Sequence, residues 1–139
     1  DMTDEQLVHI AKTAKSAGAD GIVVSNTTVE RPPNPHATDE AIFAQQGGLS
    51  GRPLKERSTA MISTVRSAVG GEWPIIGVGG ISTADDAWEK IAAGATLVQA
   101  YSAFVFEGPA LTKIIVNGLA KRLKSSPYTR ISEVVGSGS

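Results

Sequence analysis

Short polar or glycine-rich groups follow three apolar runs of this chain and are the best candidates for binding chemistry. The groups are Ser25-Asn26-Thr27, Gly79-Gly80 and Tyr101-Ser102. Hydroxyl and amide side chains at the end of an apolar strand need partners, which solvent, a ligand or nearby capping donors would supply. Adjacent glycines leave backbone N–H groups open to an anion such as a phosphate. We therefore expect a phosphate site beside a cluster of amide and hydroxyl groups.

Simpler explanations exist for Gly79-Gly80 and for a fourth candidate group, Ser50-Gly51. Gly79 and Gly80 fit a tight turn or close helix packing as well as they fit a phosphate. The stretch GVGGIS also lacks the rest of a dinucleotide fingerprint, because no acidic residue ends a following strand. Ser50 and Gly51 form either a second anion or ring contact or an N-cap with turn glycines. Spacing alone leaves these alternatives open.

No nucleophile-base pair or metal set accompanies these groups. The chain has no cysteine, which excludes disulfides, thiolate metal ligands and a cysteine nucleophile. His9 and His36 have no carboxylate or nucleophile beside them in the sequence, and we expect both at the surface. The acidic residues Asp85, Asp86 and Glu89 fit the start of a helix better than a metal site. This combination suits an enzyme whose cofactor carries the reaction.

The composition is that of an ordinary globular domain. The chain has 139 residues, a formal net charge of −1 and no apolar run of the ~20 residues that a membrane span needs. Nucleic-acid binding is not expected, because a phosphate backbone requires clustered lysine and arginine. The chain opens directly on a helix start and ends in GSGS, which indicates a fragment with a flexible tail over residues 136–139.

The candidate residues need alternating helices and strands to position them. Spacing predicts helices over 3–18, 51–71, 82–94 and 110–124, and strands over 20–26, 74–80 and 96–102. The first strand lacks alternation, so we expect it to be covered on both faces. The long loop 27–50 fits either a lid over a pocket or a variable surface excursion.

This alternation predicts a parallel α/β sheet, either doubly wound or part of a (β/α)8 barrel, with its chemistry at the carboxyl ends of the strands. Thr3 with Gln6, and Ser82 with Asp85, give two helix starts a capping pattern. A turn or a single helical turn is expected over residues 103–109. Three strands cannot close a barrel, which normally takes ~250 residues, so roughly half of a barrel would be absent.

Three ordered motifs resemble one family. The stretches SNTTVERP, GGLSGRPL and IIGVGGISTADDAWEKIAAGATLVQAYSAFVFEGP, with their spacing, are similar to the C-terminal half of dihydroorotate dehydrogenase, in its class 2, quinone-linked branch. The resemblance covers nearly the whole chain. It implies that residues 1–135 form the C-terminal half of an FMN-binding (β/α)8 barrel, and that the whole enzyme oxidises dihydroorotate to orotate in pyrimidine biosynthesis.

The resemblance also implies roles for individual residues. Asn26 and Thr27 would bind the orotate ring. The residues that would contact FMN are Ser25, Ser50, Gly51, Gly79, Gly80, Tyr101 and Ser102, the last four at its phosphate. Ser25 and Ser102 stand where relatives commonly have threonine, and either hydroxyl could serve.

Several parts of such an enzyme would lie upstream of Asp1. They are the serine base that removes a proton from C5 while hydride leaves C6 for the flavin, a flavin-contacting lysine, and the tunnel for the quinone. The resemblance implies association with a bacterial or mitochondrial inner membrane through that missing part, which would pair with this soluble, inactive segment. Two alternatives remain, another FMN or phosphate-binding barrel enzyme, and a non-catalytic half-barrel scaffold.

Overall fold

The computed structural model describes residues 1–31 and 40–138 and contains one three-stranded parallel sheet. Its strands are β1 (Ile22–Val24), β2 (Ile75–Val78) and β3 (Leu97–Gln99), in the spatial order β1-β2-β3. The register pairs Ile22 with Ile75, and Ile76 with Leu97. The predicted parallel α/β sheet is therefore confirmed, with strands shorter than the apolar runs that indicated them.

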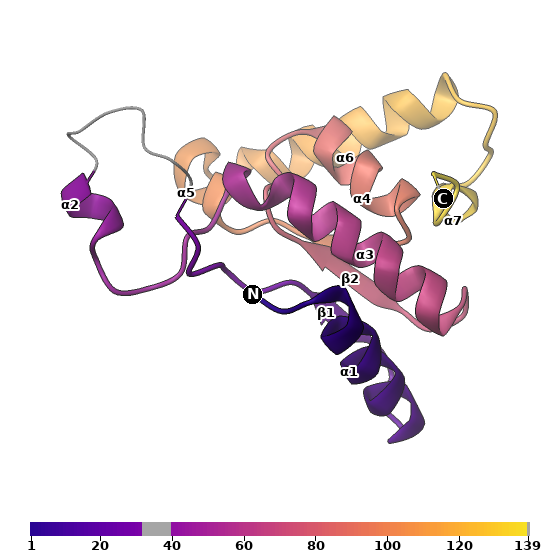
Figure 1. Cartoon of the computed structure of the whole chain (residues 1–139). Helices are drawn as coiled ribbons and strands as arrows, with labels where there is room; N and C mark the ends of the chain where they lie inside the picture. The colour runs from indigo at the N-terminus through magenta and orange to yellow at the C-terminus, as the bar shows by residue number, and fades with distance from the viewer. Residues whose placement is uncertain (32–39, 139) are drawn as a thin grey trace.

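Helices precede and follow the strands in the predicted alternation (Figure 1). The longer helices are α1 (Asp4–Ser16), α3 (Lys55–Val69), α4 (Ala84–Ala92) and α6 (Ala110–Lys124). The short ones are α2 (Glu40–Phe43), the 3-10 turn η2 (Arg52–Leu54), α5 (Ser102–Glu107) and α7 (Ile131–Val134). Helix α5 forms the connector expected after the last strand, and at six residues it is longer than the single helical turn predicted. No helix in the described residues is long and apolar enough to cross a membrane.

One of the two predicted helix starts is correct. Thr3 and Gln6 form the expected capping box at α1. At α4 the prediction of Ser82 with Asp85 is wrong by one residue, because Thr83 is the N-cap and pairs with Asp86. The Asp86 carboxylate accepts hydrogen bonds from the amides of both Ser82 and Thr83, at 3.0 and 2.9 Å, which satisfies two helix-start donors at once.

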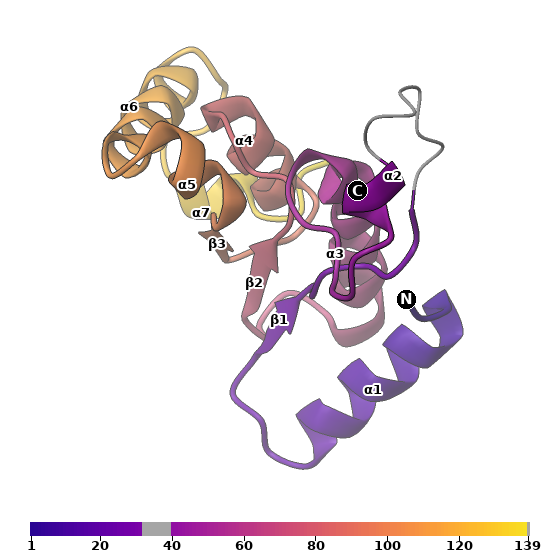
Figure 2. The same cartoon turned by 90° about the vertical axis from the view of Figure 1, so that its left-hand side faces the viewer.

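The main core lies between the sheet and the helices α1 and α3. Figure 2 shows α1, α3, α4 and α6 in an arc on one side of the strands. The buried apolar residues of this core are Leu7, Ala11, Val24, Met61, Ile62, Val65, Val69, Trp73, Ile75 and Ala95. Smaller clusters under α4, α6 and α7 continue it. Burial of one stripe on each helix thus fixes the helices to a single face of the sheet.

The opposite face of the sheet is open. Val23 on β1 and Leu97 on β3 expose 54% and 60% of their surface. The prediction that the first strand is covered on both faces is therefore wrong for this chain. Helices line only one face here, as in a sector cut from a barrel, where the inner face would need the remaining strands.

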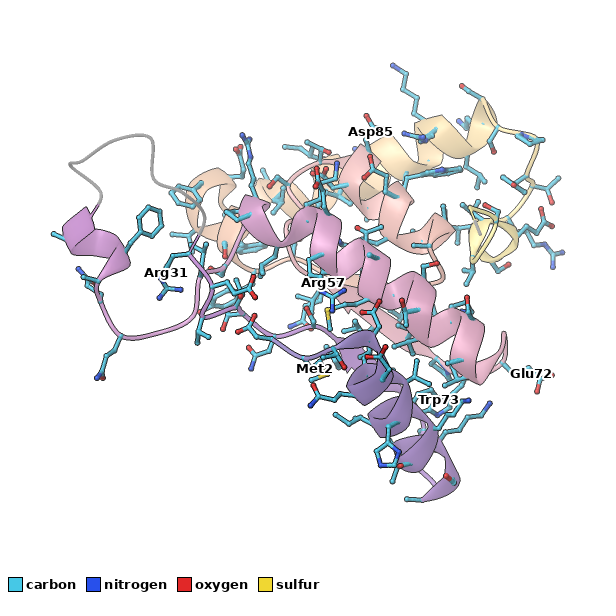
Figure 3. All side chains as sticks on the ribbon, in the orientation of Figure 1. Met2, Arg31, Arg57, Glu72, Trp73 and Asp85 are labelled. Atoms are coloured by element: carbon cyan, nitrogen blue, oxygen red, sulfur yellow. The ribbon has the colours of Figure 1, made fainter. Side chains whose placement is uncertain are left out.

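Polar side chains bind the ends of the core together (Figure 3). Arg57 on α3 donates to the backbone oxygen of Met2 and to the Asp4 carboxylate, at 2.9 and 2.8 Å. The Trp73 indole donates to the Ala19 carbonyl at 2.7 Å. At the C-terminus, expected to be a flexible tail, the amides of Gly136 and Gly138 donate to carbonyls of α4.

Candidate functional site

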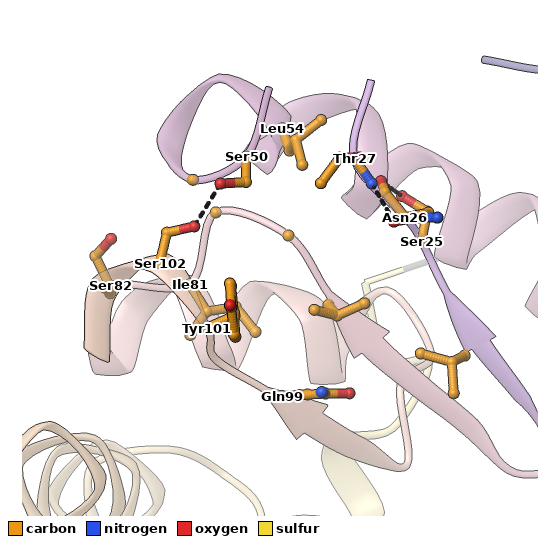
Figure 4. A pocket seen from close by; sticks show the side chains of 16 residues that line it. Ser25, Asn26, Thr27, Ser50, Leu54, Ile81, Ser82, Gln99, Tyr101 and Ser102 are labelled. Atoms are coloured by element: carbon orange, nitrogen blue, oxygen red, sulfur yellow. Dashed lines mark hydrogen bonds between the residues drawn. The ribbon is translucent and has the colours of Figure 1, made fainter. Parts of the chain in front are cut away.

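A pocket of about 420 Å³ lies at the carboxyl ends of the three strands (Figure 4). All nine residues predicted to bind a ligand line it, namely Ser25, Asn26, Thr27, Ser50, Gly51, Gly79, Gly80, Tyr101 and Ser102. Val23, Val78 and Gln99 also line it, and they belong to the open face of the sheet. The parallel arrangement brings together groups that are far apart in the sequence, as expected for such a sheet.

Gly79 and Gly80 form the tight turn and the close helix packing that their spacing allowed, and they also line the pocket. Their φ angles are +117° and +70°, which ordinary residues rarely adopt. A Cβ at Gly79 would lie 2.8 Å from Ser58 Oγ, and one at Gly80 would lie 2.7 Å from backbone atoms of Lys55. One side of this turn thus packs tightly on the start of α3, while the other side borders the pocket.

Ser50 and Ser102 meet across the pocket. Their hydroxyl oxygens are 2.7 Å apart and hydrogen bonded, although 52 positions separate them in the sequence. Gly51, with φ of +84°, is the N-cap of η2 and makes no side-chain capping bond. The alternative that Ser50 caps this helix is therefore wrong, and its hydroxyl instead bonds Ser102 at the pocket.

The segment Ser25-Asn26-Thr27 forms the opposite wall. Asn26 Oδ1 accepts a hydrogen bond from the Thr27 amide at 2.8 Å, and the Ser25 hydroxyl donates weakly to the Asn26 carbonyl at 3.3 Å. Within residues 1–31 and 40–138, the Asn26 side-chain NH₂ donates to no protein group. This leaves an oriented amide donor at the mouth of the pocket. The Val24–Ser25 peptide bond that precedes it is cis.

Arg31 holds the base of the long loop, a role that the sequence did not suggest. Its guanidinium donates to the carbonyls of Thr28 and Phe43 at 3.2 Å and to that of Gly47 at 2.7 Å. Thr28 and Leu49 also exchange two backbone hydrogen bonds. Both walls of the pocket are therefore joined just beyond the site. Figure 3 shows Arg31 between α2 and the rest of the molecule.

Residues 32–39, with His36, lie outside the described residues, so the lid hypothesis for the loop stays a prediction. His9 is exposed on α1, as expected. In the part of the chain that the structure describes, no group of three His, Asp or Glu side chains is placed to hold a metal ion.

The chemistry of the lining suits a phosphate-bearing aromatic cofactor. None of the lining residues carries an acidic side chain that would repel an anion, and none carries a basic one. The binding groups available are hydroxyls, the amides of Asn26 and Gln99, and the backbone around three glycines. Apolar side chains such as Leu54 and Ile81 add flat contact area for a ring system.

Comparison with known proteins agrees with the motifs. The family profile of dihydroorotate dehydrogenase matches residues 1–123. The chain is 46% identical over 136 residues to dihydroorotate dehydrogenase (quinone) of Streptomyces griseus, and 43% identical over 141 residues to that of Synechococcus elongatus. A crystal structure of the Eimeria tenella enzyme in complex with ferulenol superimposes with a TM-score of 0.89 at 35% identity.

The matches cover nearly all of this chain but only part of each relative. The alignments take in 98% and 99% of the chain and 37% of both curated relatives. The superposition takes in 99% of the chain and 36% of the solved one. This chain belongs to the dihydroorotate dehydrogenase family, and it spans little more than a third of its relatives' length.

Proposed function

We propose that this chain is the C-terminal part of a quinone-dependent dihydroorotate dehydrogenase that oxidises dihydroorotate to orotate in pyrimidine biosynthesis. The observation that carries this proposal is the meeting of three polar groups at one pocket, in a chain of this family. The similar proteins from Streptomyces and Synechococcus are dihydroorotate dehydrogenases that use a quinone. The full-length protein, meaning this segment with the remainder of its barrel, would carry the activity.

FMN is the cofactor that the pocket suits. Backbone amides around Gly79 and Gly80, with the hydroxyls of Tyr101 and Ser102, would hold its phosphate, because the missing side chains let an anion approach the backbone. Ser25, Ser50 and Gly51 would contact the rest of the flavin nucleotide. When bound, FMN supplies an acceptor for the hydride that leaves the substrate.

Asn26 and Thr27 would bind the substrate. An amide both donates and accepts hydrogen bonds, so Asn26 can bind an imide and a carboxylate of the same planar ring. Its Oδ1 is already fixed by the Thr27 amide, which leaves the NH₂ group oriented for the ligand. Holding the ring in one orientation lowers the entropic part of the barrier to the reaction.

The rest of the barrel would complete the site. Val23 and Leu97 expose apolar surface on the open face, and β1 and β3 are both edge strands. Edge strands with exposed apolar residues associate with further strands. The general base, the quinone tunnel and any membrane contact would come from the part outside this segment.

Flavin absorbance and orotate production test the proposal. We expect the 139-residue chain alone to hold little FMN and to turn over no dihydroorotate, because part of the cofactor site is open. The full-length protein should bind FMN stoichiometrically and reduce a quinone. Adding the separately expressed remainder of the barrel to this chain is the matched control. Full activity of the isolated chain would contradict the proposal, and bound FMN without orotate affinity in the full-length protein would indicate another flavin barrel.

A further inference from the structure

A lysine with no exposed surface lies directly behind Gly79 and Gly80, the glycine turn of the pocket. Lys90 on α4 is 0% exposed. Its ammonium donates to Ser58 Oγ and Thr59 Oγ1, both at 2.6 Å, and to the Lys55 carbonyl at 2.8 Å. All three donors of the ammonium are therefore used, and all three acceptors belong to the first turns of α3.

With respect to stability alone, burial of the Lys90 ammonium is unfavourable. Burial disfavours the charged form and lowers the pKa of Lys90 to about 8. An apolar side chain of similar length would fill the same space without this penalty, as replacements of buried ion pairs by apolar residues have shown. A buried charge that an apolar residue could replace points to a role beyond packing.

The hydrogen bonds of Lys90 lead to the pocket through Ser58. Ser58 Oγ lies 3.1 Å from the Gly79 carbonyl and 2.7 Å from the Leu54 carbonyl, and Gly79 and Leu54 both line the pocket. Gly80 packs on the backbone of Lys55, whose carbonyl is another acceptor of the Lys90 ammonium. Lys90 therefore contacts Ser58 and Lys55, the two α3 residues that pack against Gly79 and Gly80.

The charges around Lys90 balance only when it is protonated. Lys55 forms ion pairs with Asp86 at 2.7 Å and with Glu89 at 2.9 Å. These three groups together carry one negative charge, and the Lys90 ammonium cancels it. Since no lining residue of the pocket is basic, the loss of Lys90 would leave net negative charge behind an anion site.

We propose that Lys90 is a positioning residue for the phosphate of the bound cofactor, acting through Ser58 on the backbone of the glycine turn and through its charge. This inference rests on the proposed function. It predicts that Lys90 matters for a flavin that carries a phosphate and not for the flavin ring itself.

The test compares two flavins in the full-length protein. FMN and riboflavin differ by the phosphate alone, so the ratio of their dissociation constants isolates the anion site. We expect Lys90→Met to weaken FMN binding by about tenfold or more and riboflavin binding by less than about twofold. Lys90→Gln, which keeps hydrogen-bond donors but no charge, should give an intermediate loss and separates charge from geometry.

A second buried cation provides the control. Arg66 is 8% exposed and donates to the carbonyls of Gly70, Trp73 and Gly94, away from the pocket. Arg66→Met should lower stability but leave the preference for FMN over riboflavin unchanged. Equal weakening of both flavins by Lys90→Met would overturn the inference. If the unmodified protein itself shows no preference for FMN over riboflavin, both the proposed phosphate site and this inference about Lys90 fail.

Discussion

Replacing Gly80 with alanine tests the structural basis of the anion site. Gly80 has φ of +70°, and a Cβ there would lie 2.7 Å from the Cα, Cβ and N atoms of Lys55. A left-handed backbone at a residue with a Cβ costs about 1–2 kcal/mol. Overpacking against a helix backbone costs about 1–3 kcal/mol more, because that backbone cannot rotate away. We expect the full-length protein to lose roughly 2–5 kcal/mol of unfolding free energy and at least about tenfold in FMN affinity.

Two other glycines separate these contributions. Gly18 has φ of +88° with nothing within 4 Å, so Gly18→Ala carries only the backbone term, about 1–2 kcal/mol. Gly71 is equally open and its φ is not positive, so Gly71→Ala should change stability by less than about 0.5 kcal/mol. Denaturant unfolding and FMN titration of all three variants give the comparison. Equal losses for Gly80→Ala and Gly18→Ala, with FMN affinity unchanged, would refute the reasoning.

Two further predictions concern the substrate and pH. Asn26→Asp keeps an oxygen acceptor for the Thr27 amide but replaces the NH₂ donor with negative charge, so the orotate dissociation constant should rise by roughly 10- to 100-fold while Tm stays constant. An unchanged orotate titration would exclude Asn26 from the substrate site. In the unmodified protein, raising pH through about 8 removes the Lys90 proton, whereas the flavin phosphate, with a pKa of about 6, keeps its charge. The groups facing Lys90 are Lys55, Asp86 and Glu89. Asp86 first and then Glu89 raise the pKa of Lys55 by hydrogen bonding. Burial raises the pKa of Asp86, but the hydrogen bonds from Lys55 and from Ser82 and Thr83 together outweigh it, so that the pKa is lowered. Lys55 and Asp86 therefore keep their charges in this range. The preference for FMN over riboflavin should fall between pH 7 and 9. A flat pH profile of the unmodified protein, together with an undiminished preference in the Lys90→Met variant, would contradict a role for the ammonium.

The sequence predicted which polar groups meet at the pocket, because their signals are local, although each strand ends two or three residues earlier than predicted. A polar group after an apolar run marks the end of a buried strand, and the parallel topology then brings such ends together. The same reasoning left the role of Ser50 open, because its partner Ser102 is 52 positions away and spacing cannot reveal that contact. The start of α4 shows a similar limit, since STADDA fits the capping pattern in two registers and only the Asp86 contacts select one.

Lys90 could not have been found from its neighbours in sequence. A lysine in the stretch AWEKIAAG is typical of an exposed helix face, since lysine is rarely fully buried. Its acceptors Ser58 and Thr59 come from another helix, more than 30 positions earlier. Arg31 illustrates the same point in the loop. Its partners are backbone carbonyl groups, which every residue has, so the sequence carries no signal for them.

The open face of the sheet has a thermodynamic consequence. Val23, Val78 and Gln99 belong to the pocket and also to the surface that further strands would cover. Closing the barrel would therefore also complete the proposed cofactor site. A flavin that binds only the closed form adds a free energy of RT ln(1 + [L]/Kd) to its stability. FMN would therefore stabilise the association of this segment with the rest of the barrel, in addition to its proposed part in the reaction.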